Sequence, residues 1–163
     1  MKHHAADLPL EVLQQFRVIY GTMRQYFRTI EQCCGLPGSQ MWILQEIERT
    51  PSIGVTELAQ RLGIHQSTCS QLVEKLVGQH YLEKQKNPAD LRRVGLLLGP
   101  QGRSAMQRLP GPAEGVLPGA LSSMPEVALK TLNINLAELI FHLRGRDDEF
   151  AQVPLAEMVR DAE

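Results

Sequence analysis

Two segments near the ends of the chain carry an apolar stripe with the period of an α-helix. In both, apolar side chains recur at alternating steps of three and four residues, which predicts long helices with narrow seams suited to helix–helix packing. The first stripe comprises Leu13, Phe16, Tyr20, Met23, Phe27 and Ile30, and the second comprises Leu129, Leu132, Leu136, Leu139 and Leu143. The two seams could pack on each other within one chain. We favour an interface between two copies, and hence a homodimer.

Glycine and proline residues divide the chain between these stripes. Those within residues 35–38 end the first helix, Ser39 is the expected N-cap of the next, and that second helix ends near Pro51. A further helix is expected to open at Pro100, because proline suits the first turn of a helix. Further prolines and glycines predict a kink or break in this helix near residues 110–112.

The segment from Thr56 to Leu76 has the pattern of a helix-turn-helix. Ala59 is small where two helices would cross, and Gly63 permits the tight turn between them. The expected buried positions are Leu58, Leu62, Ile64, Cys69 and Leu72. An amphipathic helical hairpin would meet some of these constraints by chance, but the combined spacing favours the helix-turn-helix.

The second helix of this motif presents a polar outward face. Glutamine can pair with adenine, serine can reach bases or phosphates, and lysine can neutralise a phosphate or approach guanine, so this face suits the major groove of DNA. The expected DNA contacts are Gln66, Ser67, Ser70, Gln71 and Lys75. An ordinary solvated face would also be polar. Glu74 opposes DNA binding unless it pairs with Lys75 or accepts a hydrogen bond from cytosine.

A hairpin is expected to follow, with strands at residues 81–86 and 94–98 joined by a turn-forming, cationic loop. Arg92 and Arg93 would lie at its tip, where they suit a narrow minor groove of enhanced negative potential. Asp90 could brace one of these arginines by a paired hydrogen bond. A hairpin tip with surface arginines is otherwise commonplace.

Charge is distributed unevenly along a chain whose formal net charge is only −1. Residues 54–104 carry seven Lys and Arg against four Asp and Glu, whereas residues 145–163 carry two against six. A locally basic module is what phosphate binding requires, because the electrostatic term depends on charge near the groove. The composition therefore allows DNA binding and predicts modest non-specific affinity.

Several other classes of protein and site are disfavoured. No run approaches the roughly 18 consecutive apolar residues that a membrane span needs, and no apolar leader follows the first residues, so a soluble, cytoplasmic protein is expected. Three cysteines without a Cys-x-x-Cys pair and five scattered histidines indicate neither a disulfide framework nor a metal site. No acid–base pair, nucleophile elbow or phosphate-cradling glycine loop is present, which argues against an enzyme.

From about Leu8 to Leu143 the chain resembles the MarR family of bacterial regulators, and the wing carries the most specific part of the resemblance. The matching wing residues are Pro88, Asp90, Arg92 and Arg93, followed by Leu96, Leu98, Gly102 and Arg103. The order of the helices agrees as well. Three positions depart from the family pattern: Leu91 replaces a wing arginine, Gly99 replaces a helix-capping threonine, and Gln71 stands where arginine is frequent.

The resemblance implies a cytoplasmic homodimer that places one recognition helix and one wing on each half of a pseudo-palindromic operator in double-stranded DNA. It implies a repressor that needs no cofactor and is released by a small aromatic or phenolic effector, bound between the dimer helices and the winged region. Expected cleft residues are Tyr20, Arg24, Trp42 and Met106.

These expectations describe a mainly α protein with a small β wing, a winged helix-turn-helix flanked by N- and C-terminal dimerisation helices. One domain would span residues 1–163, with dimerisation helices at 8–34 and 105–144, the DNA-binding region at 53–104 and an acidic extension at 145–163.

Two alternatives stay open on the sequence alone. A winged-helix protein-interaction module would lack the salt-dependent DNA affinity expected of a regulator. A redox-sensing regulator would use Cys33 and Cys34, although neighbouring cysteines form only strained disulfides. Cys69 is expected to be a buried apolar filler.

Overall fold

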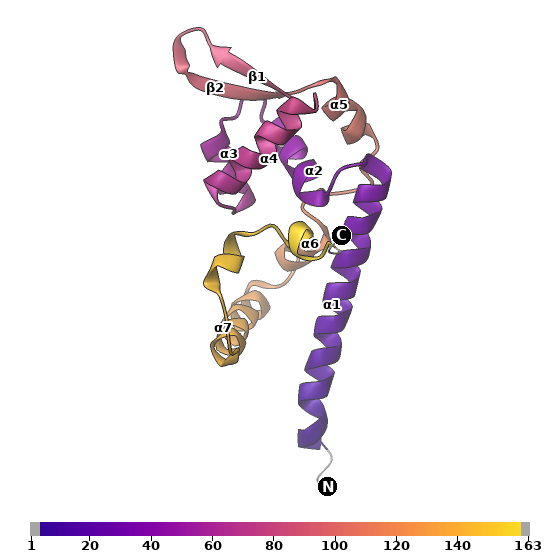
Figure 1. Cartoon of the computed structure of the whole chain (residues 1–163). Coiled ribbons are helices and arrows are strands. Elements are labelled where there is room, and N and C mark those ends of the chain that lie inside the picture. The colour runs from indigo at the N-terminus through magenta and orange to yellow at the C-terminus, as the bar shows by residue number, and fades with distance from the viewer. Residues whose placement is uncertain (1–3, 161–163) are drawn as a thin grey trace.

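The computed structural model describes residues 4–160, and side chains from residue 7 onward. The elements in chain order are α1 (His4–Cys34), α2 (Gly38–Arg49), α3 (Val55–Leu62), α4 (Gln66–Gly78), β1 (Leu82–Asn87), β2 (Asp90–Leu98), α5 (Pro100–Gln107), α6 (Val116–Ser122), α7 (Glu126–His142), the 3₁₀ helix η1 (Asp148–Gln152) and α8 (Leu155–Met158). Helices α2 to α5 and the β-hairpin form a head, from which α1 extends as a long arm (Figure 1). The expected fold class, mainly α with a small β wing, is confirmed.

The head is built around the helix-turn-helix formed by α3 and α4. Leu58 and Leu76 are fully buried, together with Ile43 and Leu44 of α2. Gly63 ends α3 with φ at +66°, a left-handed conformation that glycine adopts without steric cost. The turn is closed by the backbone amide of Ile64, which donates to the carbonyl of Ala59 at 3.1 Å. The predicted motif and its turn are confirmed.

The wing is a two-stranded antiparallel hairpin whose register pairs Leu82 with Leu98 and Lys86 with Val94. Strand β2 begins at Asp90, earlier than expected, because an irregular pairing of Asn87 with Asp90 extends the ladder toward the turn. The expectation that Arg92 and Arg93 form the loop tip is therefore wrong. Both lie on the first part of β2, and Pro88 and Ala89 occupy the tip.

The break predicted after α5 is confirmed, and it forms a packed corner. Helix α5 starts with Pro100 in its first turn, as expected, and ends at Gln107. Eight residues then separate it from the start of α6. The Tyr26 hydroxyl donates to the carbonyl of Pro112 at 2.9 Å, and the amide of Ala113 donates to Oε1 of Gln45 at 3.0 Å. The proline- and glycine-rich segment is thus held against α1 and α2 by hydrogen bonds.

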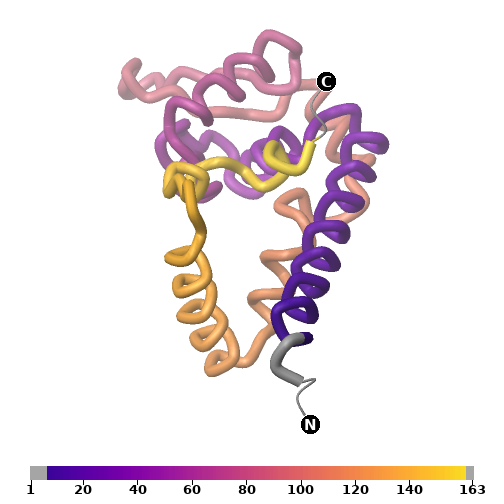
Figure 2. The backbone as a smooth tube through the Cα atoms, turned by 60° about the horizontal axis from the view of Figure 1, so that its bottom comes forward, coloured from indigo at the N-terminus to yellow at the C-terminus, as the bar shows by residue number. Residues whose placement is uncertain are grey.

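The apolar stripes of α1 and α7 are only partly covered within one chain. On α1, Phe27 and Ile30 are buried, whereas Phe16 and Tyr20, farther along the arm, are 39% and 50% exposed. No residue of α7 is buried. Figure 2 shows α7 running apart from α1, so the two stripes do not form one continuous seam in the described chain.

The segment expected to be an acidic extension is folded for most of its length. After α7 the chain turns back through η1 and α8, and Pro154, Ala156 and Val159 are buried against the arm and α2. The extension at 145–163 is therefore corrected: residues 145–153 are exposed, the part from Pro154 to Val159 is docked on the rest of the chain, and residues 161–163 lie outside the described part of the chain.

Ser39 is also placed differently from the expected N-cap. Helix α2 begins one residue earlier, at Gly38, and Pro37 holds the N-cap position without a side-chain hydrogen bond. Ser39 is buried in the first turn, and its hydroxyl donates to the carboxylate of Glu157 in α8. The N-cap expectation is wrong because Pro37, with φ fixed near −58°, already sets the start of the helix.

Candidate nucleic-acid interface

Helix α4 separates an apolar inner face from a polar outer face. Cys69, Val73 and Leu76 are buried in the head, and Leu72 is half-buried. The five expected contact residues fall on the remaining surface: Gln66, Ser67, Gln71 and Lys75 are exposed, and Ser70 is half-buried. The helix therefore presents amide, hydroxyl and ammonium groups together, which is the chemistry needed to meet base edges and phosphates.

Two side-chain contacts connect α4 to its neighbours. The Gln66 amide donates to the hydroxyl of Thr56 at 3.0 Å, which links the start of α4 to the start of α3. Glu74 forms an ion pair with Lys84 on β1. From the sequence, Lys75 or a cytosine were the partners that would let Glu74 face DNA, and the structure pairs its carboxylate with Lys84 instead. Glu74 thereby joins the recognition helix to the wing.

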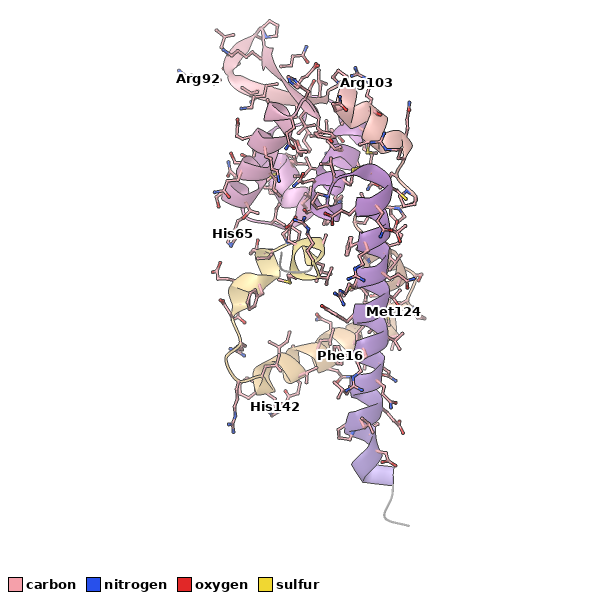
Figure 3. All side chains as sticks on the ribbon, turned by 45° about the vertical axis from the view of Figure 1, so that its right-hand side comes forward. Phe16, His65, Arg92, Arg103, Met124 and His142 are labelled. Atoms are coloured by element: carbon pink, nitrogen blue, oxygen red, sulfur yellow. The ribbon has the colours of Figure 1, made fainter. Side chains whose placement is uncertain are left out.

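The arginines of the wing extend into solvent from β2. Asp90 accepts a hydrogen bond from the backbone amide of Arg92 at 3.0 Å and lies 3.8 Å from Nε of Arg93. This contact to Arg93 is a single long ion pair and not the expected paired hydrogen bond, and the side chain of Arg93 is 81% exposed. Figure 3 shows Arg92 on the outer part of the hairpin, away from the arm. Asp90 thus orders the start of the strand while both guanidinium groups stay accessible.

A groove of about 730 Å³ lies between the wing and the start of α3. Its wing side carries Lys86, Arg92 and Arg93, and its other side is formed by Gly54 to Thr56 at the N-terminus of α3. Free backbone amides and the helix dipole favour an anion at such an end, and the three cations add to that attraction. Glu57 also lines the groove, but Nη2 of Arg61 lies 2.6 Å from its carboxylate.

The sequence alone did not identify Thr56, Lys84 and Lys86 as parts of this surface. A usable signal existed in the strand period of two, which places Lys84 and Lys86 on the same face of β1. Thr56 could not be assigned without knowing that the base of the wing lies beside α3. This neighbourhood is created by hydrogen bonds between Ile53 and Leu96 and between Ser52 and Leu96.

The four residues expected to line an effector cleft do not come together. Arg24 lines a cavity of about 190 Å³, and Trp42 lines another of about 200 Å³. Neither Tyr20 nor Met106 lines either of these cavities. Tyr20 lies on the free part of α1, and Met106 is half-buried in α5.

The two cavities lie side by side and differ in chemistry. They share three wall residues, Phe27, Gly38 and Ala156. The first cavity is cationic, with Arg24, Arg28 and Arg160 against Glu31. The second is mainly apolar, and its one charged residue is Glu114. The region between the arm and the head therefore joins a cationic lining to a mainly apolar one.

The cysteines lie in unlike surroundings. Cys33 is exposed, whereas Cys34 and Cys69 are buried. Burial raises the pKa of the Cys34 thiol, and neighbouring Cys33 adds to this rise while the Arg108 guanidinium opposes it. Burial alone raises the pKa of Cys69 to about 11, in keeping with a buried filler. The pair Cys33 and Cys34 thus combines one accessible thiol with one that is held protonated.

Thiol labelling is expected to modify one cysteine per native chain. At pH 8 the buried thiols of Cys34 and Cys69 remain protonated because their pKa values are raised, and the thiolate is the reactive species. Peptide mass spectrometry after iodoacetamide treatment should find Cys33 modified in the native protein and all three cysteines modified after denaturation. Fast native labelling of Cys34 would contradict this expectation and would support a redox pair.

Metal and membrane sites find no support in residues 4–160. Within this range, no group of three or more His, Cys, Asp or Glu side chains is arranged to hold a metal ion. None of the described helices is both long and apolar enough to cross a membrane.

Comparison with known proteins finds one family match, which lies in the head. Residues 35–93, which run from the end of α1 through the first part of the wing, match the model of the MarR family. No curated protein sequence gives a significant match. The resemblance to MarR regulators, first suggested by the wing, is confirmed for this region.

Solved structures agree with the fold of the larger part of the chain. A mutant of MarR from E. coli, complexed with operator DNA, is 18% identical, with 79% of this chain and 95% of that chain covered and a TM-score of 0.52. The YusO protein from Bacillus subtilis is 17% identical, with 85% and 99% covered and a TM-score of 0.53. A MepR-like protein complexed with pseudoligands is 18% identical, with 85% and 94% covered and a TM-score of 0.54. The winged helix-turn-helix fold is confirmed.

Proposed function

We propose that this chain, whose head matches the MarR family and whose fold is that of MarR-type structures, is a cytoplasmic, homodimeric repressor of transcription that binds double-stranded operator DNA. The family match and the fold support a DNA-binding transcriptional regulator. No enzymatic step is part of the proposal.

The observation that carries the proposal is the joint placement of α4 and the wing on one head. Helix α4 offers Gln71 and Lys75 for the major groove, and the wing offers Arg92 and Arg93 for the neighbouring minor groove. The cationic groove between the wing and the start of α3 provides room for a phosphate of the DNA backbone. This arrangement favours DNA over a protein partner, because three cations face open solvent with few apolar side chains among them.

The uncovered stripes support a dimer. On the stripe of α1, Phe16 and Tyr20 are more than a third exposed, and so are Leu139 of α7 and Leu143, which directly follows it. Such a set of large apolar side chains on two helices is more than a monomer normally leaves in water. We propose that a second copy covers them, with the arm of one protomer packing against α7 of its partner. Two heads would then face two halves of a pseudo-palindromic site.

An aromatic or phenolic effector fits the region between the arm and the head. The cationic cavity beside Arg24 suits a carboxylate, and the adjoining apolar cavity beside Trp42 suits a ring. A MepR-like protein of similar fold was solved with pseudoligands. We propose that a bound effector lowers operator affinity and thereby relieves repression.

The test is fluorescence anisotropy with DNA from around the protein's own gene and random DNA as control, across a salt series and with aromatic acids added. The regulator requires specific binding whose apparent affinity falls by roughly 0.9 log units per log unit of salt for each neutralised phosphate. Binding indistinguishable from random DNA would favour the protein-interaction module.

Replacing both wing arginines with alanine should weaken binding to every DNA sequence by about tenfold or more and should lower the salt slope by roughly two for each protomer. Gln71→Ala should instead change the ranking of operator variants, because a base-reading side chain is lost at a cost of about 1–3 kcal/mol at its preferred base. The same anisotropy assay checks both variants. Identical behaviour of the two across sequences would contradict this division of labour.

A further inference from the structure

Residues 147–160 form a C-terminal segment that we call the strap. Its last part is docked on the arm and on α2 by three buried residues, Pro154, Ala156 and Val159. Gly38 makes room for it: a Cβ atom there would lie 2.5 Å from Cδ1 of Phe27 and 3.1 Å from Cβ of Ala156. The surface under α8 therefore fits the strap closely.

Polar contacts fix the same end of the strap. Ser39 donates to the carboxylate of Glu157, and the guanidinium of Arg160 pairs with Glu31 of α1 at 3.1 Å. Both contacts join the strap to the junction of α1 and α2, which also holds the two cavities. The strap contributes Ala151 and residues 153–156 to the apolar cavity, and Ala156, Val159 and Arg160 to the cationic one. The strap is thus a shared wall of both cavities.

The other end of the strap contacts the head at the entry to the recognition helix. Glu149, in η1, accepts a hydrogen bond from Nε2 of His65 at 2.9 Å. His65 is the N-cap residue of α4, directly before the first expected DNA contact, Gln66. Figure 3 shows His65 at the end of the head that faces the strap. Gln152 lines a further groove with Thr56, His65 and Gln66.

One continuous segment therefore connects the cavities to the first turn of the recognition helix. We propose that Glu149 is a positioning residue: through His65 the strap holds the start of α4 in its DNA-binding orientation, and displacement of the strap by a cavity ligand releases it. This inference rests on the proposed function, since it names the regulation of the same DNA-binding site. Preorganised contacts raise affinity because less ordering is required on binding.

The direction in which operator affinity changes on substitution of Glu149 separates a positioning role from a purely electrostatic one. Glu149 is acidic and 77% exposed at its side chain, so removing its charge should by itself strengthen attraction to DNA. Positioning predicts the opposite for Glu149→Ala, because the hydrogen bond to His65 is lost. Glu149→Gln removes the same charge while its amide oxygen can still accept from His65. Positioning therefore predicts that this variant keeps at least the affinity of the unmodified protein.

The experiment measures operator affinity by anisotropy and backbone hydrogen exchange by mass spectrometry for both variants in the full chain. Glu138→Ala is the matched control, because Glu138 forms a similar exposed contact with His142 at 3.0 Å within α7. We expect Glu149→Ala to lower operator affinity by about two- to fivefold, within the range of an exposed pair, and to speed exchange across residues 64–69. Glu149→Gln and Glu138→Ala should neither lower operator affinity nor speed exchange across residues 64–69.

Exchange is measured without DNA, so it tests the inference even if the proposed function fails. If the unmodified protein shows no specific DNA binding, the proposed function falls, while the exchange of residues 64–69 still supports or overturns the coupling. Unchanged exchange there in Glu149→Ala, or a gain in operator affinity equal to that of Glu149→Gln, overturns the positioning role.

Discussion

Replacing Leu13 and Phe16 with glutamate should convert the protein from a dimer to a monomer and lower operator affinity by more than about a hundredfold. Both side chains lie on the free part of α1 and are 46% and 39% exposed, so the fold of one chain does not depend on burying them. Four added carboxylates in an apolar interface would be costly to desolvate. The monomer would then bind half an operator and lose the avidity of two joined heads, which is worth about 10²–10⁴ in affinity.

Sedimentation velocity and the anisotropy assay measure these two effects on the same samples. The control is Gln25→Glu with Gln32→Glu, which adds the same charge to exposed positions on the opposite face of α1. A dimeric double-glutamate variant would refute the assignment of the α1 stripe to the interface. A monomer with undiminished operator affinity would refute the two-headed mode of binding.

Gly102→Ala should lower the free energy of unfolding by about 3 kcal/mol, at the upper end of the range for overpacking. A Cβ atom at this position of α5 would lie 2.2 Å from the carbonyl oxygen of Tyr81. The obstruction is backbone, which cannot rotate away as a side chain could. Gly99 is held by a similar approach, since its Cβ would lie 2.4 Å from the carbonyl of His80. This contact explains why glycine, and not threonine, precedes α5.

Urea denaturation followed by circular dichroism gives the unfolding free energy. Gly119→Ala is the matched control: Gly119 also lies within a helix, and a Cβ there meets nothing within 4 Å. The control should be neutral or more stable by about 0.5–1 kcal/mol, because alanine loses less backbone entropy than glycine. Equal stability of the two variants would show that α5 can shift away from Tyr81 at little cost.

Most of the head could be predicted from the sequence because its signals are local and periodic. The turn at Gly63, the buried positions of α3 and α4 and the turn-forming loop of the wing each constrain a few adjacent residues. The extent of β2 was missed, since Asp90 pairs with Asn87 across a turn whose irregular register no strand pattern reveals. The family resemblance supplied the arrangement of the elements, which periodicity alone could not.

The strap and the cavities could not be predicted for a different reason. The strap buries only three residues, without a repeating stripe, and its acidic composition resembles that of a solvated tail. Its docking depends on a space left by Gly38, more than a hundred residues earlier in the chain. Of the residues expected at one effector cleft, Arg24 and Trp42 line two different cavities, which share Phe27 and Ala156 as walls, and the other two line neither.

Because no residue of α7 is buried, the helix content of the protein should depend on its concentration. A helix of 17 residues without tertiary support is only marginally stable in water. The far-ultraviolet helical signal of α7 should therefore follow the law of mass action, falling as the protein is diluted below its self-association constant. Secondary structure in this part of the chain would then be a property of the pair of molecules, acquired on encounter.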